Sequence, residues 1–296
     1  MASRPVLQMP PEPAEPGPAL QAVPSPGRAG RNLPAAIGVG VVLAALVTVP
    51  LFSPYRWLFI VVVAVAAAIG SHEIMTALRT LGPRPAAVPV VVGGVSMVAA
   101  AYLGGSEALF FTWLATVVLC LLWRVAAPPQ GFLRDLAASV FTATYVPFLI
   151  SFAALMAIPA DGPRRVTIFV ATVTASDIGG YAAGVLFGKH PMAPTVSPKK
   201  SWEGFCGSLL ACSLAGAVFF VTLFHASALL GVLFGLAVVA TATLGDLGES
   251  MVKRDIGIKD MGHLLPGHGG LMDRLDSLLP TAPVALLLLS AFLPTS

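Results

Sequence analysis

The sequence carries little charge for its length. Only 10% of its 296 residues are charged, whereas 56% are hydrophobic and the mean hydropathy is +0.86. An ordinary soluble domain has charge on about a quarter of its residues, so a water-soluble fold of this size would lack polar surface. The composition argues against a cytosolic globular enzyme, a disordered protein and a fibrous protein.

Cysteine is also scarce, and no strong excess of one charge exists. The three cysteines, Cys120, Cys206 and Cys212, lie in apolar segments, which favours small buried side chains over a disulfide or a metal site. The net charge of +3 gives no argument for nucleic acid as a partner.

Long apolar runs dominate what is present. Runs of about 20 residues indicate membrane-spanning helices, and their continuous apolar character disfavours the alternating strands of a β-barrel. We therefore predict an all-α polytopic membrane protein with about nine transmembrane helices. We expect Pro50, Pro147 and Pro280 to kink or cap the helices that carry them. The expected spans are 34–53, 57–78, 87–104, 107–126, 136–158, 166–187, 205–224, 227–245 and 278–294.

Three regions follow from this pattern. Residues 1–33 are rich in Pro, Gly and Ala and are expected to form a disordered cytosolic tail, because they cannot bury a core. Residues 34–160 hold the N-terminal transmembrane helices. Residues 161–296 hold the C-terminal catalytic transmembrane region with its cytosolic motif loops.

The distribution of Lys and Arg predicts the orientation. With a cytosolic N-terminus and nine spans, 14 of the 17 basic residues fall on the cytosolic side. The opposite orientation would reverse this ratio, and cytosolic loops normally carry the excess of positive charge. We predict a multi-pass protein of the cell (inner) membrane whose N-terminus and active site face the cytosol.

The first of two charged stretches, 177–203, suggests an anion site. Asp177 lies in an apolar run, where an ionisable residue is costly and usually functional, although a paired structural charge is a serious alternative. Lys199, Lys200 and Ser201 precede a predicted helix, which suits a phosphate, although positive-inside anchoring would also explain the lysines. Glu203 is expected to cap that helix or orient a lysine. Gly180, Gly184 and Gly188 form a smooth helix face that favours close helix packing over ligand contact.

The second stretch, 246–276, points to a cation and phosphate. Asp246, Glu249, Ser250 and Lys253 form one polar stripe if this segment is helical, and the wet face of an interfacial helix is an equal alternative. Asp273 and Asp276 would share a face one turn apart. Carboxylates that face a phosphate-binding surface need a cation between them, and Mg²⁺ fits that need.

The glycines and histidines of this stretch leave more than one interpretation open. Gly267, Gly269 and Gly270 could supply N–H groups to an anion nest or form a flexible turn. His268 could bind metal, donate to phosphate or be structural. Zinc is disfavoured because the neighbourhood lacks further ligands. His72–Glu73 starts no zinc-protease motif, because Thr76 stands where the second His is needed.

The second stretch resembles the signature motif of the phosphatidate cytidylyltransferases, also called CDP-diacylglycerol synthases, and 177–204 resembles the family's upstream motif. The likeness covers roughly the last 120 residues. The positions that carry it are Ser250, Lys253, Arg254, Lys259, Asp260, Pro266, His268, Gly269, Gly270, Asp273, Arg274 and Asp276.

The resemblance implies a phospholipid-biosynthesis enzyme that converts CTP and phosphatidate to CDP-diacylglycerol and pyrophosphate at the cytosolic membrane surface. It implies Mg²⁺ on Asp246 and Asp273, with room for a second cation such as K⁺. The lipid bilayer is a further partner, nucleic acid is not, and a homodimer is left open. Two alternatives are another lipid-phosphate enzyme, such as a polyprenol kinase, and a transporter that uses the intramembrane Asp177.

The candidate site residues divide by expected role. The candidate catalytic residues are Lys253, Arg254, His268 and Asp276. The candidate nucleotide-binding residues are Asp177, Lys199, Lys200 and Ser201, and the candidate metal ligands are Asp246 and Asp273.

Overall fold

The computed structural model describes residues 33–262, 264 and 269–293, and most of these residues are helical. One antiparallel hairpin, β1 (Pro191–Ala193) with β2 (Ser197–Ser201), stands between two of the helices. The helical elements are α1 (Leu33–Phe52), α2 (Trp57–Arg79), α3 (Ala87–Val125), α4 (Phe132–Ala143), the π-helix η1 (Thr144–Phe148), α5 (Leu149–Met156), α6 (Gly162–Phe187), α7 (Trp202–Phe224), α8 (Ala228–Ile256), α9 (Met272–Leu275) and α10 (Leu278–Phe292). The predicted all-α class is confirmed.

Seven helical segments of the described residues are long and apolar enough to cross a membrane. The multi-pass prediction is therefore confirmed, but the count of nine is not. The expected spans 87–104 and 107–126 correspond to the two helices that meet at a kink within α3, where Gly105 has a non-helical φ of +72°. Glycine tolerates that conformation at little steric cost. Helix α1 has 20 residues and coincides with the first expected span, 34–53.

The outer surface of these helices suits lipid. Leu103 is 82% exposed, Leu186 72% and Val49 68%. Exposed large apolar side chains on this scale mark an interaction surface rather than a water-facing one, and hydrocarbon tails solvate them without cost. The tail that was predicted to be disordered lies, up to residue 32, outside the described residues.

The π-helix η1 accounts for the predicted distortion at Pro147. Proline has no N–H to give to a helical hydrogen bond, and here it lies inside η1 between α4 and α5. The three elements still form one membrane-length segment, Phe132–Met156. The predicted effect of Pro147 is thus confirmed as a local π turn.

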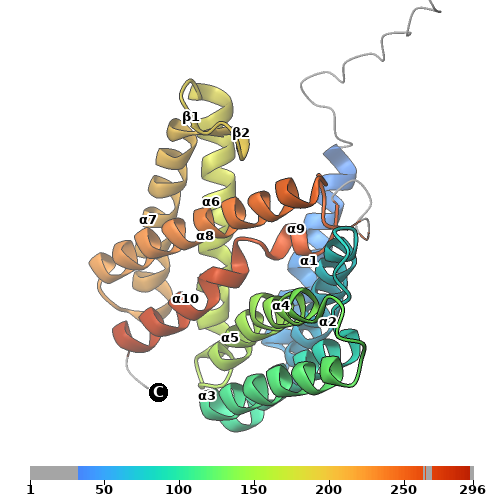
Figure 1. The fold of residues 1–296 in the computed structure, drawn as a ribbon. Coiled ribbons are helices and arrows are strands. Elements are labelled where there is room, and N and C mark those ends of the chain that lie inside the picture. Colours follow the sequence, from blue (N-terminus) through green and yellow to red (C-terminus); the bar gives the residue numbers. More distant parts are fainter. Residues whose placement is uncertain (1–32, 263, 265–268, 294–296) are drawn as a thin grey trace, which may run out of the picture.

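Figure 1 shows two groups of helices. Helices α1 to α5 lie together, and α6, α7 and α8 form the second group, with α10 running beside α8 and also packing on α5. The short helix α9 lies between α8 and α2 and contacts α2. The two charged stretches of the sequence are therefore held at the helix ends near the hairpin and around α9.

Candidate active site

A cavity of about 290 Å³ opens where α6, β2, α7 and α8 meet. Asp177 from α6, Lys199, Lys200 and Ser201 from β2, and Asp246 from α8 all line it. Its volume is at the lower end for small-molecule sites, about 300 Å³. The structure thus brings all four predicted nucleotide-binding residues and one predicted metal ligand around a single space.

Close packing of α6 on α7 builds the wall of this cavity. A Cβ at Gly180 would lie 2.4 Å from Ser208 Oγ, and one at Gly207 would lie 2.5 Å from the carbonyl oxygen of Gly179. Side chains at these positions would force the two helices apart. The predicted packing role is confirmed for Gly180, whereas a Cβ at Gly184 would come no closer than 3.7 Å to its neighbours, and both glycines also line the cavity.

The hairpin carries the two lysines to the cavity, and local hydrogen bonds fix its ends. Ser201 is the N-cap of α7, since its Oγ accepts the N–H of Gly204 at 3.1 Å. Glu203 accepts the N–H groups of Lys189 and His190 at 3.1 and 3.2 Å and pairs with His190 Nδ1 at 2.6 Å. Glu203 also acts at the start of α7, as expected, because its carboxylate accepts its own backbone N–H in the first turn. The same carboxylate holds the start of the hairpin.

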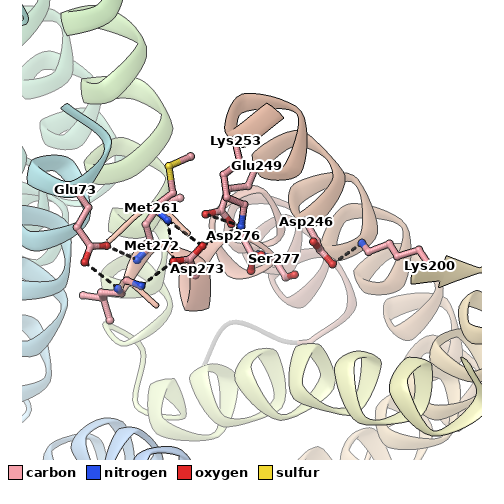
Figure 2. A network of polar contacts seen from close by, with 12 residues as sticks. Glu73, Lys200, Asp246, Glu249, Lys253, Met261, Met272, Asp273, Asp276 and Ser277 are labelled. Carbon is pink, nitrogen blue, oxygen red and sulfur yellow. Dashed lines mark hydrogen bonds and ion pairs between the residues drawn. The ribbon is translucent and has the colours of Figure 1, made fainter. Parts of the chain in front are cut away.

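An ion pair joins the two charged stretches. Lys200 of β2 pairs with Asp246 of α8 at the cavity (Figure 2). Both side chains are partly exposed, at 24% and 35%. A cation predicted to bind phosphate and a carboxylate predicted to bind metal therefore neutralise each other in this structure.

A second cluster lies one turn further along α8. Lys253 Nζ is 2.9 Å from Asp273 Oδ1 and 3.5 Å from Glu249 Oε1 (Figure 2). The Glu249 side chain is completely buried. Glu249 therefore does not belong to the wet face of an interfacial helix, because a fully buried side chain does not face water. A buried charge needs a paired partner, and Lys253 is that partner.

Asp273 organises the segment that follows α8. It accepts the backbone N–H of Met261 at 3.0 Å and that of Gly270 at 2.7 Å, in addition to its ion pair with Lys253. The N–H of Gly270 is thus used by a carboxylate, so the expectation that it contributes to an anion nest is wrong. Gly267 and His268 lie outside the described residues.

Asp276 stands three residues further, between the two clusters. Its Oδ1 accepts the N–H of Ser277 at 2.7 Å, and its carboxyl group lies beside that of Glu249. It is also close enough to Asp177 to repel the negative charge there, as Asp246 is. In Figure 2, Asp276 and Ser277 lie between Asp273 and Asp246.

A smaller hollow of about 120 Å³ lies beside the end of α8. Lys253, Arg254 and Lys259 give it three positive charges, and Ser197 and Ser250 add hydroxyl groups. Arg254 Nε also donates to the carbonyl of Val196 at 3.2 Å, which ties the hairpin to α8. This hollow brings together the predicted catalytic residues Lys253 and Arg254 in a setting that suits an anion.

The two predicted metal ligands each have a lysine as counter-ion. Within 33–262, 264 and 269–293, no group of three acidic, His or Cys side chains converges as a metal site. Asp246 is paired with Lys200 and Asp273 with Lys253. These two acids fit Mg²⁺. The ammonium group beside each carboxylate occupies a position that a divalent cation could take. Mg²⁺ needs only one or two carboxylates, because phosphate oxygens and water complete its coordination.

Sequence reasoning missed Glu73, which belongs to α2. Its carboxylate accepts the N–H groups of Leu271 and Met272 at 3.1 and 2.8 Å (Figure 2). The available signal was an acidic residue inside an apolar span, which is a functional hypothesis in its own right.

Comparison with known proteins gives one consistent result. The model of the Cytidylyltransferase family matches residues 31–292. A phosphatidate cytidylyltransferase of Mycobacterium leprae is 46% identical over 275 residues, covering 87% of this chain and 88% of that protein. One from Mycobacterium bovis is 44% identical over 278 residues, with 89% and 90% covered. Phosphatidate cytidylyltransferase 4, chloroplastic, of Arabidopsis thaliana is 30% identical over 280 residues, with 84% and 70% covered.

Proposed function

Because this chain belongs to the cytidylyltransferase family, we propose that it transfers the cytidylyl group of CTP to phosphatidate, giving CDP-diacylglycerol and pyrophosphate. The single observation that carries the proposal is the meeting of β2 and α8 at one cavity, where Lys200 pairs with Asp246. Cations for a triphosphate and carboxylates for its counter-ion then lie around the same space. A polyprenol kinase and a transporter are less favoured, because neither accounts for the family match.

The reaction needs little covalent help from the protein. A phosphate oxygen of phosphatidate forms a bond to the α-phosphorus of CTP, and the bond from that phosphorus to the pyrophosphate oxygen breaks. The nucleophile is already anionic near pH 7, since the second pKa of a phosphate monoester is about 6. Catalysis therefore rests on positioning and charge neutralisation, as in other phosphoryl transfers.

The two hollows suit the two phosphate-bearing substrates. Lys199 and Lys200 would hold the triphosphate in the larger cavity, with Ser201 at the start of α7. Lys253 and Arg254 would receive phosphate oxygens in the smaller one. When Lys200 turns to a phosphate, Asp246 loses its counter-ion and is free for another cation.

Asp246 and Asp273 are the residues that would hold Mg²⁺, and the ion would supply neutralisation of the triphosphate and of the leaving pyrophosphate. A second cation such as K⁺ remains a prediction from the family resemblance, as does a homodimer.

The protein is a multi-pass membrane protein, and we place its site on the cytosolic face of the inner membrane. The support is the distribution of Lys and Arg and the location of CTP in the cytosol.

The reaction can be tested on the purified full-length chain in lipid vesicles. With CTP, phosphatidate and Mg²⁺, we expect CDP-diacylglycerol and pyrophosphate to form in equal amounts. Diacylglycerol replaces phosphatidate as the control, because it lacks the nucleophilic phosphate. Product formed from a polyprenol and a nucleoside triphosphate, without turnover of phosphatidate, would favour the kinase and contradict the proposal.

The orientation gives a separate prediction. In a variant without Cys120, Cys206 and Cys212, a cysteine replacing exposed Asp255 should react with a membrane-impermeant maleimide only when the cytosolic side is open. A cysteine replacing Ala160, which lies in the loop between α5 and α6, is the matched control and should react in intact cells. The opposite pattern of labelling would overturn the topology.

A further inference from the structure

Glu73 places a carboxylate from the N-terminal helices against the catalytic segment. It is 8% exposed, near the C-terminal end of α2, and each of its two oxygens accepts one N–H, from Leu271 and from Met272. The contacts span 198 and 199 residues of sequence. A buried carboxylate is costly unless hydrogen bonds satisfy its charge, so this docking geometry is specific.

Two glycines make the approach possible. A Cβ at Gly262 would lie 2.4 Å from Glu73 Oε1, and one at Gly270 would lie 2.6 Å from Oε2. The backbone on both sides of the loop and the start of α9 therefore pack around this one carboxylate.

The same short backbone segment sets the position of Asp273. Leu271 and Met272 directly precede it, and the N–H of Gly270 donates to Asp273 Oδ2 at 2.7 Å. Asp273 in turn holds Lys253. A shift of residues 270–272 away from Glu73 would move Asp273, and Asp276 one turn later, relative to the α8 residues that they face.

On the basis of the proposed cytidylyltransferase reaction, we propose that Glu73 is a positioning residue that fixes the Asp273 segment in its reactive geometry. It contacts neither cavity, so it acts through the backbone it binds. The N-terminal helices thereby take part in catalysis, although the family signature lies in the C-terminal region.

A general stabilising role is the competing explanation, and Asp135 provides the matched control. Asp135 of α4 is also buried, at 3% exposure, and accepts the N–H of Arg84 at 2.7 Å while pairing with Arg124 at 3.1 Å. Asp135 and its partners Arg84 and Arg124 belong to the N-terminal half and lie outside both cavities. Loss of Asp135 therefore removes a comparable buried carboxylate without touching the Asp273 segment.

The test compares Glu73→Gln with Asp135→Asn in full-length protein in vesicles. Glutamine keeps the shape, but its NH₂ group faces a backbone N–H, so one of the two hydrogen bonds is lost. For Glu73→Gln we expect kcat to fall on the order of 10- to 100-fold, as small displacements of catalytic groups do. The KM for CTP should stay unchanged, because the lysine cavity is untouched. Asp135→Asn should lower the yield of folded protein and leave kcat per folded molecule near that of the parent.

Hydrogen exchange gives a readout that does not depend on activity. Amides of peptides covering 269–276 should exchange faster in Glu73→Gln and at the parental rate in Asp135→Asn. Gly262→Ala should reproduce the kinetic and exchange effects of Glu73→Gln, because the new methyl group would lie 2.4 Å from Glu73 Oε1 and displace the carboxylate. If Glu73→Gln yields no folded protein, the kcat and exchange rates of Gly262→Ala test the positioning role instead.

The outcomes separate this inference from the proposed reaction. An inactive parent protein would overturn the reaction, and the exchange rates would still test the link between Glu73 and the Asp273 segment. An active parent with unchanged kcat in Glu73→Gln or, failing that, in Gly262→Ala would overturn the positioning role. Equal loss of kcat per folded molecule in Asp135→Asn would also overturn it.

Discussion

Asp273→Asn is expected to lower turnover by about 100-fold or more, the usual cost of removing one preorganised electrostatic group from a reaction centre. The carboxylate faces Lys253 at 2.9 Å and takes the N–H groups of Met261 and Gly270. Asparagine preserves the shape but removes the negative charge and replaces one acceptor oxygen with a donor. Turnover of CTP with phosphatidate, measured per folded molecule over a Mg²⁺ titration, checks the expectation.

The Mg²⁺ titration distinguishes a metal ligand from a loop anchor. If Asp273 only holds the loop through Lys253, the folded Asp273→Asn protein should keep the Mg²⁺ requirement of the parent. If it binds the cation, turnover should be nearly lost or the requirement should move to higher Mg²⁺. Asp161→Asn is the matched control, since Asp161 pairs with Arg165 at 2.8 Å and lies outside both cavities. Normal specific activity with a normal titration in Asp273→Asn would refute the metal assignment.

The fold was predictable to the extent that apolar runs determine helices. The runs located the helices and the composition required a bilayer, and the kink at Gly105 falls between the expected spans 87–104 and 107–126. The apolar pattern does not give the backbone conformation at which two such helices are joined. The distortion at Pro147 was predictable, because it follows from a single residue's missing N–H.

The site was predictable as a set of residues and not as a set of contacts. Asp177 stood out because charge in apolar sequence is costly, Lys200 because it precedes a helix, and Asp246 because it starts a polar stripe. The three residues do meet at one cavity. That Lys200 pairs with Asp246 and Lys253 with Asp273 depends on how the hairpin, α8 and α9 pack. Glu203 shows the same limit, because its helix-start position indicated a cap, while its bonds to the N–H groups 13 and 14 residues earlier depend on the hairpin.

Among the lysines of the hairpin region, we expect loss of Lys200 to lower kcat/KM for CTP the most. It lines the larger cavity and its ion pair with Asp246 is partly exposed. Exposed ion pairs contribute only about 0–1 kcal/mol to stability, so Lys200→Met should fold with nearly parental thermal stability. Its kcat/KM for CTP should fall by about 100-fold, because an ammonium group that faces transferring phosphates stabilises charge in the transition state.

Two further lysines of the same hairpin region separate a local role of Lys200 from a general loss of positive charge. Lys189 is exposed and lines neither cavity, so Lys189→Met should keep parental kcat/KM. Lys199 lines the same cavity as Lys200 but is more exposed, and its loss should have an intermediate effect. The gradient follows from screening, because water weakens the interaction of a charge with phosphate as exposure increases. Equal losses in all three variants would point to general attraction of CTP to a basic surface and would contradict a specific role for Lys200 in the cavity.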